Sequence, residues 1–194
     1  VEYYCDCCKK VDYKKADDFD SDLFEKARRE FNRRKEYLIF PRQRIPDGYN
    51  TRQMKNFEYE YFYQMFNERQ LLCLSILLEE ILQIEDRNVR EFMIITFSDS
   101  LNTNNIFCRY EPDTKKITVL GGGFHAYWPP PAPTENNVWG TKFGRGSFAR
   151  VFRKTLRAKE YADAPYEIRV KNENVGKVII GDSINGVFVS DFTE

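Results

Sequence analysis

The stretch NFEYEYFYQMFNERQLLCLSILLEEILQIEDRNVREFMIITFSDSLN, residues 56–102, decides the fold class. Asn67 can cap a helix with Gln70 as its capping-box partner, and the residues from Leu71 to Leu82 are apolar on nearly every side. Because a helix that is apolar all round is buried, this segment is predicted to be the central helix. A further helix is predicted to start after Asp86 and to end at the polar residues 98–105.

The residues just before Asn67 are rich in aromatic rings. Their spacing predicts another helix, with one face formed by Phe57, Tyr61, Phe62, Met65 and Phe66. Aromatic rings also stack on nucleic-acid bases, but the helical spacing favours packing in the core.

The flanking segments complete an α+β fold. Residues 1–20 read as a half zinc knuckle and an irregular loop, and residues 21–37 as an amphipathic helix capped by Asp22. In later segments the apolar residues recur at every second position, which is typical of strands. This pattern predicts a hairpin at 106–123 and short strands at 166–170, 177–181 and 186–190. We therefore expect three to four helices, followed by a small, mainly antiparallel sheet with one further basic helix. Residues 21–194 are expected to form a single α+β domain.

Composition restricts the class of protein. No apolar run approaches the roughly 20 residues of a membrane span, and no signal peptide is visible after Val1. The odd number of cysteines, five, does not suit the disulfide framework of a secreted domain. We expect a cytoplasmic protein without a membrane partner, cut from a longer polypeptide.

Basic residues gather in one segment. Between Asn136 and Lys159 there are seven Lys or Arg and no Asp or Glu, although the whole chain has a formal net charge of zero. Glycines at 140, 144 and 146 precede a predicted basic helix at about 147–161, whose apolar face is expected to bury Phe148, Val151, Phe152 and Leu156. Ser147 is expected to cap that helix, and its free amides could attract a phosphate. The candidate nucleic-acid contacts are Lys142, Arg145, Ser147, Arg150, Arg153, Lys154 and Arg157.

The same residues have two other interpretations, an ordinary solvent-exposed surface and a catalytic site. A basic helix after a flexible turn is often only a solvated surface. The glycine segment lacks the lysine of a phosphate-binding loop and follows no apolar strand, so ATP chemistry is not indicated. The single histidine, His125, has no nucleophile with a supporting carboxylate near it in sequence.

Three cysteines crowd the N-terminus. Cys5 and Cys8 have the Cys-x-x-Cys spacing with which two thiolates hold zinc, and Cys7 is a further candidate ligand. A structural zinc site needs four ligands, so these residues predict at most a partial zinc site. Thiols without any ligand role are the alternative.

Four stretches of the sequence together resemble the central region of zinc-ribbon-containing adenine-specific DNA methyltransferases. They are YYCDCCKK, IPDGYNTRQ, YFYQMFNERQLLCLSILLEEI and ENNVWGTKFGRGSFARVFRKTLRAKEY. The resemblance covers about Tyr3 to Tyr161. Its most specific part is the motif formed by Phe66, Arg69, Gln70, Leu71 and Leu72.

The resemblance implies an S-adenosylmethionine-dependent enzyme that flips and methylates an adenine. This chain lacks the family's catalytic tetrapeptide and its cofactor motif, so S-adenosylmethionine is expected only in the full-length enzyme. We expect a non-catalytic region that contacts double-stranded DNA and the rest of the methyltransferase chain. A structural or protein-interaction module without DNA binding is the alternative, and a free-standing enzyme using His125 is a third, weaker hypothesis.

Overall fold

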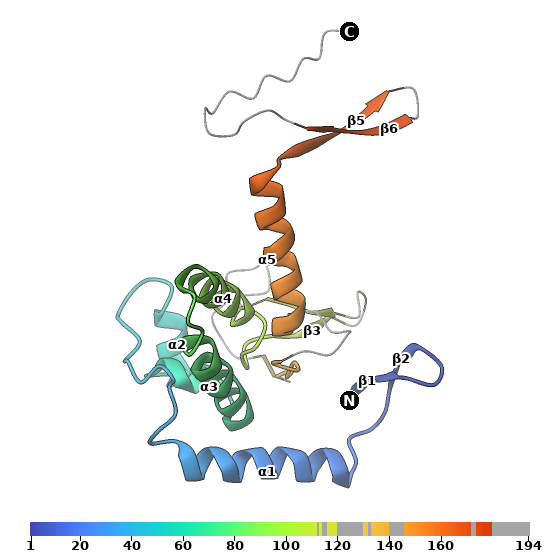
Figure 1. Cartoon of the computed structure of the whole chain (residues 1–194). Helices are drawn as coiled ribbons and strands as arrows, with labels where there is room; N and C mark the ends of the chain where they lie inside the picture. Colours follow the sequence, from blue (N-terminus) through green and yellow to red (C-terminus); the bar gives the residue numbers. More distant parts are fainter. Residues whose placement is uncertain are drawn as a thin grey trace. The chain divides into compact units, whose positions relative to one another are not determined.

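The computed structural model describes residues 1–111, 113, 116–119, 130–131, 133–139, 146–171 and 174–179. The chain divides into two compact units, Val1–Val151 and Phe152–Glu194. The regular secondary structure of the described residues consists of helices and short antiparallel hairpins, which confirms the α+β class (Figure 1). The described strands pair as separate two-stranded hairpins, and the first of these precedes the helices.

Helix α3 (Glu68–Leu82) is the centre of the first unit, as the sequence predicts. Asn67 Oδ1 accepts a hydrogen bond from Gln70 N at 2.8 Å, and Gln70 Oε1 accepts one from Asn67 N at 3.0 Å. Helices α1 (Asp18–Arg34) and α4 (Arg87–Ser100) both pack on α3. Asp86 caps α4 by accepting from Val89 N at 2.9 Å, so the predicted start of this helix is also confirmed.

Helix α1 starts earlier than the sequence pattern predicts. Asp17, not Asp22, is the cap, because the side chains of Asp17 and Asp20 each accept from the other's backbone N–H at 3.1 Å. The helix ends at Arg34, so the exposed Tyr37 lies beyond it rather than on its last turn.

The prediction of an irregular N-terminus was wrong. Strand β1 (Glu2–Cys5) pairs with β2 (Lys10–Tyr13) in an antiparallel hairpin. The connecting turn ends at Lys9, which has a positive φ of 56° and donates its N–H to Cys5 O at 2.9 Å. The two strands therefore flank the turn that carries Cys7 and Cys8, and Cys5 at the end of β1 pairs with Lys10.

The predicted helix across the aromatic segment was also wrong. Helix α2 (Arg52–Asn56) ends before Phe57, and only a short 3-10 helix, η1 (Phe62–Met65), follows. Backbone groups that a helix would use instead pair with the preceding loop: Ile45 N donates to Glu60 O at 2.8 Å, and Phe62 N donates to Gln43 O at 3.2 Å. Tertiary pairing therefore overrides the helical spacing.

Among the described residues of the first unit, three apolar clusters form the core. One joins α3 and α4 through Leu74, Ile81 and Phe97, and also contains Val138 and Phe148. A second joins α1 to α3 around Phe31, Leu38, Leu71 and Leu72. The third lies under the aromatic segment and contains Ile45, Met54, Met65 and Phe107, with Tyr59, Phe62 and Phe66 packed against it. Much of the aromatic segment is therefore core, as expected.

The predicted C-terminal elements are present where they can be described. Strands β3 (Tyr110–Glu111) and β4 (Lys116–Ile117) form the expected hairpin in a shorter version. Helix α5 (Phe148–Asp163) is followed by the antiparallel pair β5 (Tyr166–Lys171) and β6 (Asn174–Ile179). The third predicted strand, at 186–190, lies outside the described residues. None of the described helices has the length and apolar character needed to cross a membrane.

Candidate nucleic-acid interface

The start of helix α5 is fixed to the end of α4 through Gly146. Gly146 has a φ of +85°, a conformation that favours glycine. Its carbonyl oxygen accepts from Thr103 Oγ1 at 3.0 Å and from Asn104 Nδ2 at 2.8 Å. A Cβ added at Gly146 would lie 2.1 Å from Thr103 Oγ1. Only glycine therefore fits at the point where the glycine-rich segment enters the helix.

The first amides of α5 already have protein partners. Phe148 N donates to Val138 O at 2.8 Å, and Ala149 N donates to Trp139 O at 3.2 Å. The expectation that these helix-start amides are free for a phosphate was therefore wrong, because the preceding segment uses them.

Ser147 does not cap α5 with its side chain. Its backbone oxygen accepts from Arg150 N and Val151 N, both at 3.0 Å, but its buried Oγ has no hydrogen-bond partner among the residues that the structure describes. The expected side-chain cap was wrong, and burial leaves Ser147 no surface with which to meet DNA.

Basic side chains remain exposed along α5. Arg150, Arg153, Lys154 and Arg157 are all exposed, and their spacing in sequence places them on one face of the helix. Lys142 and Arg145 lie outside the described residues, so the structure does not place them. Phe148 and Val151 are buried as expected, whereas Leu156 is exposed, so the expectation that it anchors the helix was wrong.

The segment before α5 is held against α3 by a partly buried ion pair. Glu135 accepts two hydrogen bonds from Arg69, at 2.6 and 2.8 Å, and one from Asn67 Nδ2 at 3.0 Å. Further along, Trp139 Nε1 donates to Cys73 O at 2.9 Å. The two most recognisable motifs of the sequence, the RQLL helix and the ENNVWG segment, therefore bind each other. Glu135 was missed from the sequence because nothing local indicates a partner so distant in the chain.

The N-terminal turn brings two of its three cysteines together. The pKa of the Cys5 thiol is lowered, chiefly because the backbone N–H of Cys8 donates to its sulfur, with the Cys8 thiol and the Cys7 N–H as further donors. The hydrogen bond to Cys5 raises the pKa of the Cys8 thiol. Cys7 is exposed. Backbone amides that donate to the Cys5 sulfur stabilise its thiolate form, which is the form that binds a metal. Two neighbouring thiols in this arrangement suit a metal-binding knuckle.

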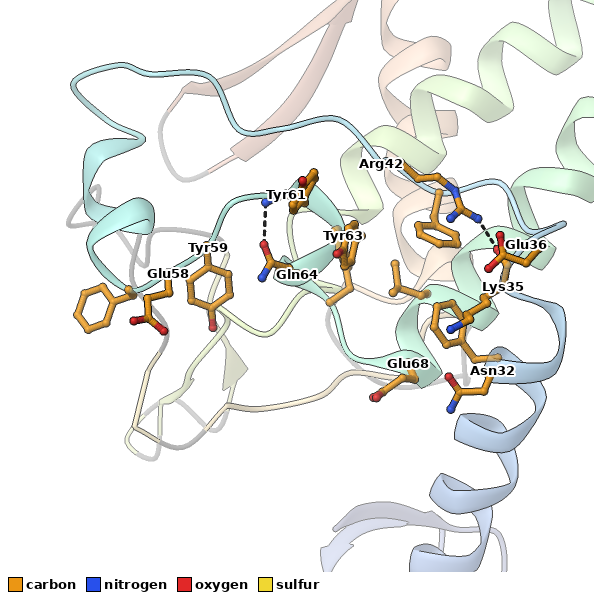
Figure 2. Close-up of a pocket in the computed structure, with 15 residues that line it drawn as sticks. Asn32, Lys35, Glu36, Arg42, Glu58, Tyr59, Tyr61, Tyr63, Gln64 and Glu68 are labelled. Atoms are coloured by element: carbon orange, nitrogen blue, oxygen red, sulfur yellow. Dashed lines mark hydrogen bonds between the residues drawn. The ribbon is translucent and has the colours of Figure 1, made fainter.

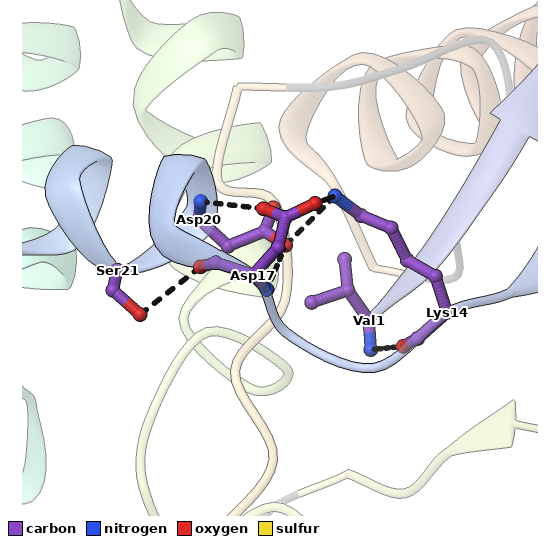
Figure 3. A network of polar contacts seen from close by, with 5 residues as sticks. All are labelled: Val1, Lys14, Asp17, Asp20 and Ser21. Carbon is purple, nitrogen blue, oxygen red and sulfur yellow. Dashed lines mark hydrogen bonds and ion pairs between the residues drawn. The ribbon is translucent and has the colours of Figure 1, made fainter.

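A polar network ties this hairpin to α1 (Figure 3). Val1 N donates to Lys14 O at 2.7 Å, and Lys14 Nζ lies 2.7 Å from Asp17 Oδ2 and 2.8 Å from Asp20 Oδ2. The cysteine turn is thus carried on a hairpin whose base is attached to the start of a helix. Within the described parts of the chain, no group of three or more His, Cys, Asp or Glu side chains is placed to hold a metal. His125 lies outside those parts.

An open groove lies between α1 and the aromatic segment (Figure 2). It has a volume of about 810 Å³. We call it the aromatic groove; its rings are Phe31, Phe40, Phe57, Tyr59, Tyr61 and Tyr63, with Phe66 beside them. Tyr61 and Tyr63 stack with ring centroids 5.5 Å apart. Sequence reasoning assigned this segment to the core and missed the groove.

Comparisons of the chain with models of protein families, with curated proteins and with solved structures gave no match.

Proposed function

We propose that the chain is a non-catalytic, DNA-contacting region of an S-adenosylmethionine-dependent adenine-specific DNA methyltransferase. The observation that supports this most is the exposed basic face of α5, in a segment from Asn136 to Lys159 that contains no acidic residue. Basic side chains with this spacing suit the phosphates of a duplex, which provide most of the affinity of nonspecific DNA binding.

The contacts between motifs support the resemblance on which the enzyme class rests. Arg69 and Glu135 belong to separate stretches that resemble the methyltransferases, and the ion pair between them makes both stretches parts of one folded unit. These residues bind other parts of the protein, so their proposed role is to position the start of α5. S-adenosylmethionine would bind to other parts of a full-length enzyme.

Salt-dependent DNA binding tests the proposal. The affinity of the 194-residue chain for a short duplex would be measured by fluorescence anisotropy at several salt concentrations. Replacing Arg153 and Arg157 by Ala should lower the slope of log K against log salt by about 1.8, since each lost phosphate contact removes about 0.9. The matched control replaces Arg29 and Arg33 by Ala, which removes two arginines at the same spacing from α1.

Equal slopes for the wild type and the α5 variant would contradict the DNA proposal. So would an equal loss in the α1 control, because the effect would then reflect net charge rather than the basic face of α5.

We further propose that Cys5 and Cys8 supply two ligands of a zinc site, with the remaining ligands outside the described residues. Zinc would hold the N-terminal turn in a fixed shape and would select the thiolate form of both cysteines. Competition with a chromogenic chelator under reducing conditions should show that Cys5→Ser and Cys8→Ser weaken zinc binding. Cys7→Ser should leave it unchanged, and an equal loss in that variant would contradict the pairing of Cys5 with Cys8.

Exposed apolar side chains favour a second candidate, a protein-interaction module. On α1, Phe19 is 67% exposed and Leu23 is 45% exposed. Such side chains suit docking on another part of a larger protein. If this function is correct, sedimentation should show association that increases with protein concentration and does not respond to DNA. Replacing both Phe19 and Leu23 with Ser should remove that association. This result would favour the interaction module over the DNA-contacting region.

A further inference from the structure

An arginine beside the aromatic groove is held between a ring and a carboxylate. The guanidinium carbon of Arg44 lies 5.7 Å from the centre of the Tyr61 ring, and Arg44 Nη2 donates to Glu60 Oε2 at 2.8 Å. The ring attracts the cation and the carboxylate neutralises it, so both contacts stabilise the same guanidinium group. Tyr61 also stacks on Tyr63, so its ring already has partners within the protein.

A second arginine repeats this arrangement on α3. The guanidinium carbon of Arg69 lies 4.9 Å from the centre of the Phe24 ring, and Arg69 donates its two hydrogen bonds to Glu135. At the groove itself, Arg42 lies over the Phe40 ring at 4.2 Å. Rings of the first unit therefore hold guanidinium groups, in two cases together with a carboxylate.

One end of the aromatic groove has a ring and a carboxylate without a cation. Sequence spacing predicts Phe57 on a buried helical face, yet its side chain is 53% exposed, and the adjacent Glu58 is exposed as well. In the described parts of the chain, Phe57 has no cation over its ring and Glu58 forms no ion pair. This end of the groove therefore offers both kinds of partner that Arg44 has, and both are open to solvent.

Carboxylates line the groove from one end to the other. Figure 2 shows Glu58 and Glu36 at opposite ends of the lining residues, with Glu68 between them. None of the three forms an ion pair with another described residue. The cationic side chains of the groove are Lys35 and Arg42, and Arg42 is engaged because it also donates to Lys35 O. Charge complementarity therefore favours an occupant with positive charges spaced along its length.

The shape of the groove favours a chain segment as that occupant. Its volume of about 810 Å³ is far more than one guanidinium group fills, and it is open to solvent along α1 and the aromatic segment. Sites for small molecules instead enclose most of the surface of their ligand. Arginine suits the groove better than lysine, because a planar guanidinium group stacks on a ring and pairs with a carboxylate at the same time.

We propose that the aromatic groove is a docking site for an extended, arginine-containing segment of a partner protein. One guanidinium group would lie on the Phe57 ring and pair with the Glu58 carboxylate, as Arg44 does with Tyr61 and Glu60. Further arginines of the same segment would pair with the other carboxylates of the groove. The inference goes beyond the proposed function, since it uses neither the basic face of α5 nor the exposed apolar side chains of α1.

A titration of the isotope-labelled 194-residue chain with a blocked peptide, in which arginine alternates with serine, tests the proposal. Alternate side chains of an extended peptide lie on the same side, so several arginines can face the groove. Nuclear magnetic resonance detects weak binding, and the amide signals of residues 57–63 should shift. The affinity should fall as salt is added, because the carboxylates are exposed.

A double variant removes the ring and the charge at the open end of the groove. Phe57→Leu/Glu58→Gln should weaken binding of the peptide by about 3- to 150-fold, the range expected for losing one cation–π contact and one exposed ion pair. Tyr49→Leu/Glu85→Gln is the matched control, because it changes an exposed ring and an exposed carboxylate outside the groove. The control should bind the peptide like the wild type, and the amide spectra of both variants would verify folding.

Changes in the peptide test the chemistry of the occupant. Citrulline has nearly the shape of arginine without its charge, so a citrulline peptide should not bind, and a lysine peptide should bind more weakly than the arginine peptide. Equal binding of the citrulline peptide, no shifts at residues 57–63 with the arginine peptide, or equal losses in the two double variants would overturn the proposal.

Other occupants give distinguishable results. Argininamide that binds as tightly as the peptide would assign the groove to a small molecule, and a short DNA duplex that displaces the peptide from residues 57–63 would assign it to DNA. Either result would overturn the proposal. Phe57→Leu/Glu58→Gln should also keep the duplex affinity of the wild type, so the groove and the basic face of α5 are tested separately.

Discussion

Replacing Gly146 by Ala is expected to destabilise the connection between α4 and α5. The positive φ of +85° alone costs a non-glycine residue about 1–2 kcal/mol. The new Cβ would also lie 2.1 Å from Thr103 Oγ1 and 2.3 Å from Thr103 Cβ, and relieving such overpacking costs about 1–3 kcal/mol. We therefore expect a loss of about 2–5 kcal/mol, a large part of the roughly 5–15 kcal/mol of a typical domain.

Urea unfolding, followed by circular dichroism, would measure this loss. Gly48→Ala is the matched control, because among the described atoms its Cβ would meet only Thr51 Oγ1, at 3.3 Å, and Gly48 has no positive φ. Its effect should stay within about 0.5 kcal/mol, as for most surface substitutions.

A double-mutant cycle separates the two costs. In a Thr103→Gly background the clashing atoms are gone, so Gly146→Ala should cost only about 1–2 kcal/mol for its backbone conformation. An equal cost of Gly146→Ala in both backgrounds would refute the steric reasoning. If Thr103 is retained and Gly146→Ala lowers the free energy of unfolding no more than Gly48→Ala does, the whole account of this turn would be refuted.

Three further predictions concern the ion pair, the N-terminal network and a buried thiol. A double-mutant cycle of Arg69→Ala and Glu135→Ala should give a coupling energy of about 1–2 kcal/mol in urea unfolding, because the hydrogen bonds are charge-assisted but partly exposed; additive losses would contradict the contact. The pKa of Asp17 is lowered to about 2, chiefly by its hydrogen bond to Lys14, so its stabilising effect is complete above the unfolded value near 3.8 and disappears as the pH falls toward 2. Melting curves should therefore show a smaller acid loss between those pH values for Asp17→Asn than for the wild type. Finally, burial raises the pKa of the Cys108 thiol to about 11, so mass spectrometry after iodoacetamide treatment at neutral pH should find it unlabelled until denaturant is added.

The sequence by itself determined the elements whose signals are local. The capping box of Asn67 and Gln70 and the cap at Asp86 place the starts of α3 and α4, because both depend on residues within one helical turn. The apolar residues 71–82 likewise mark a buried helix before any partner is known. Basic residues of α5 could also be read directly, since charge and spacing are properties of the chain.

Only the tertiary structure decided what the remaining segments do. The aromatic residues 57–66 have helical spacing, yet their backbone pairs with residues 43–45, because hydrogen bonds to a distant loop replace those of a local helix. In the same way, Val138 and Trp139 use the first amides of α5, and Glu135 reaches Arg69 across a long interval of sequence. Such contacts depend on which chain segments the folded core brings together, and no local pattern encodes that.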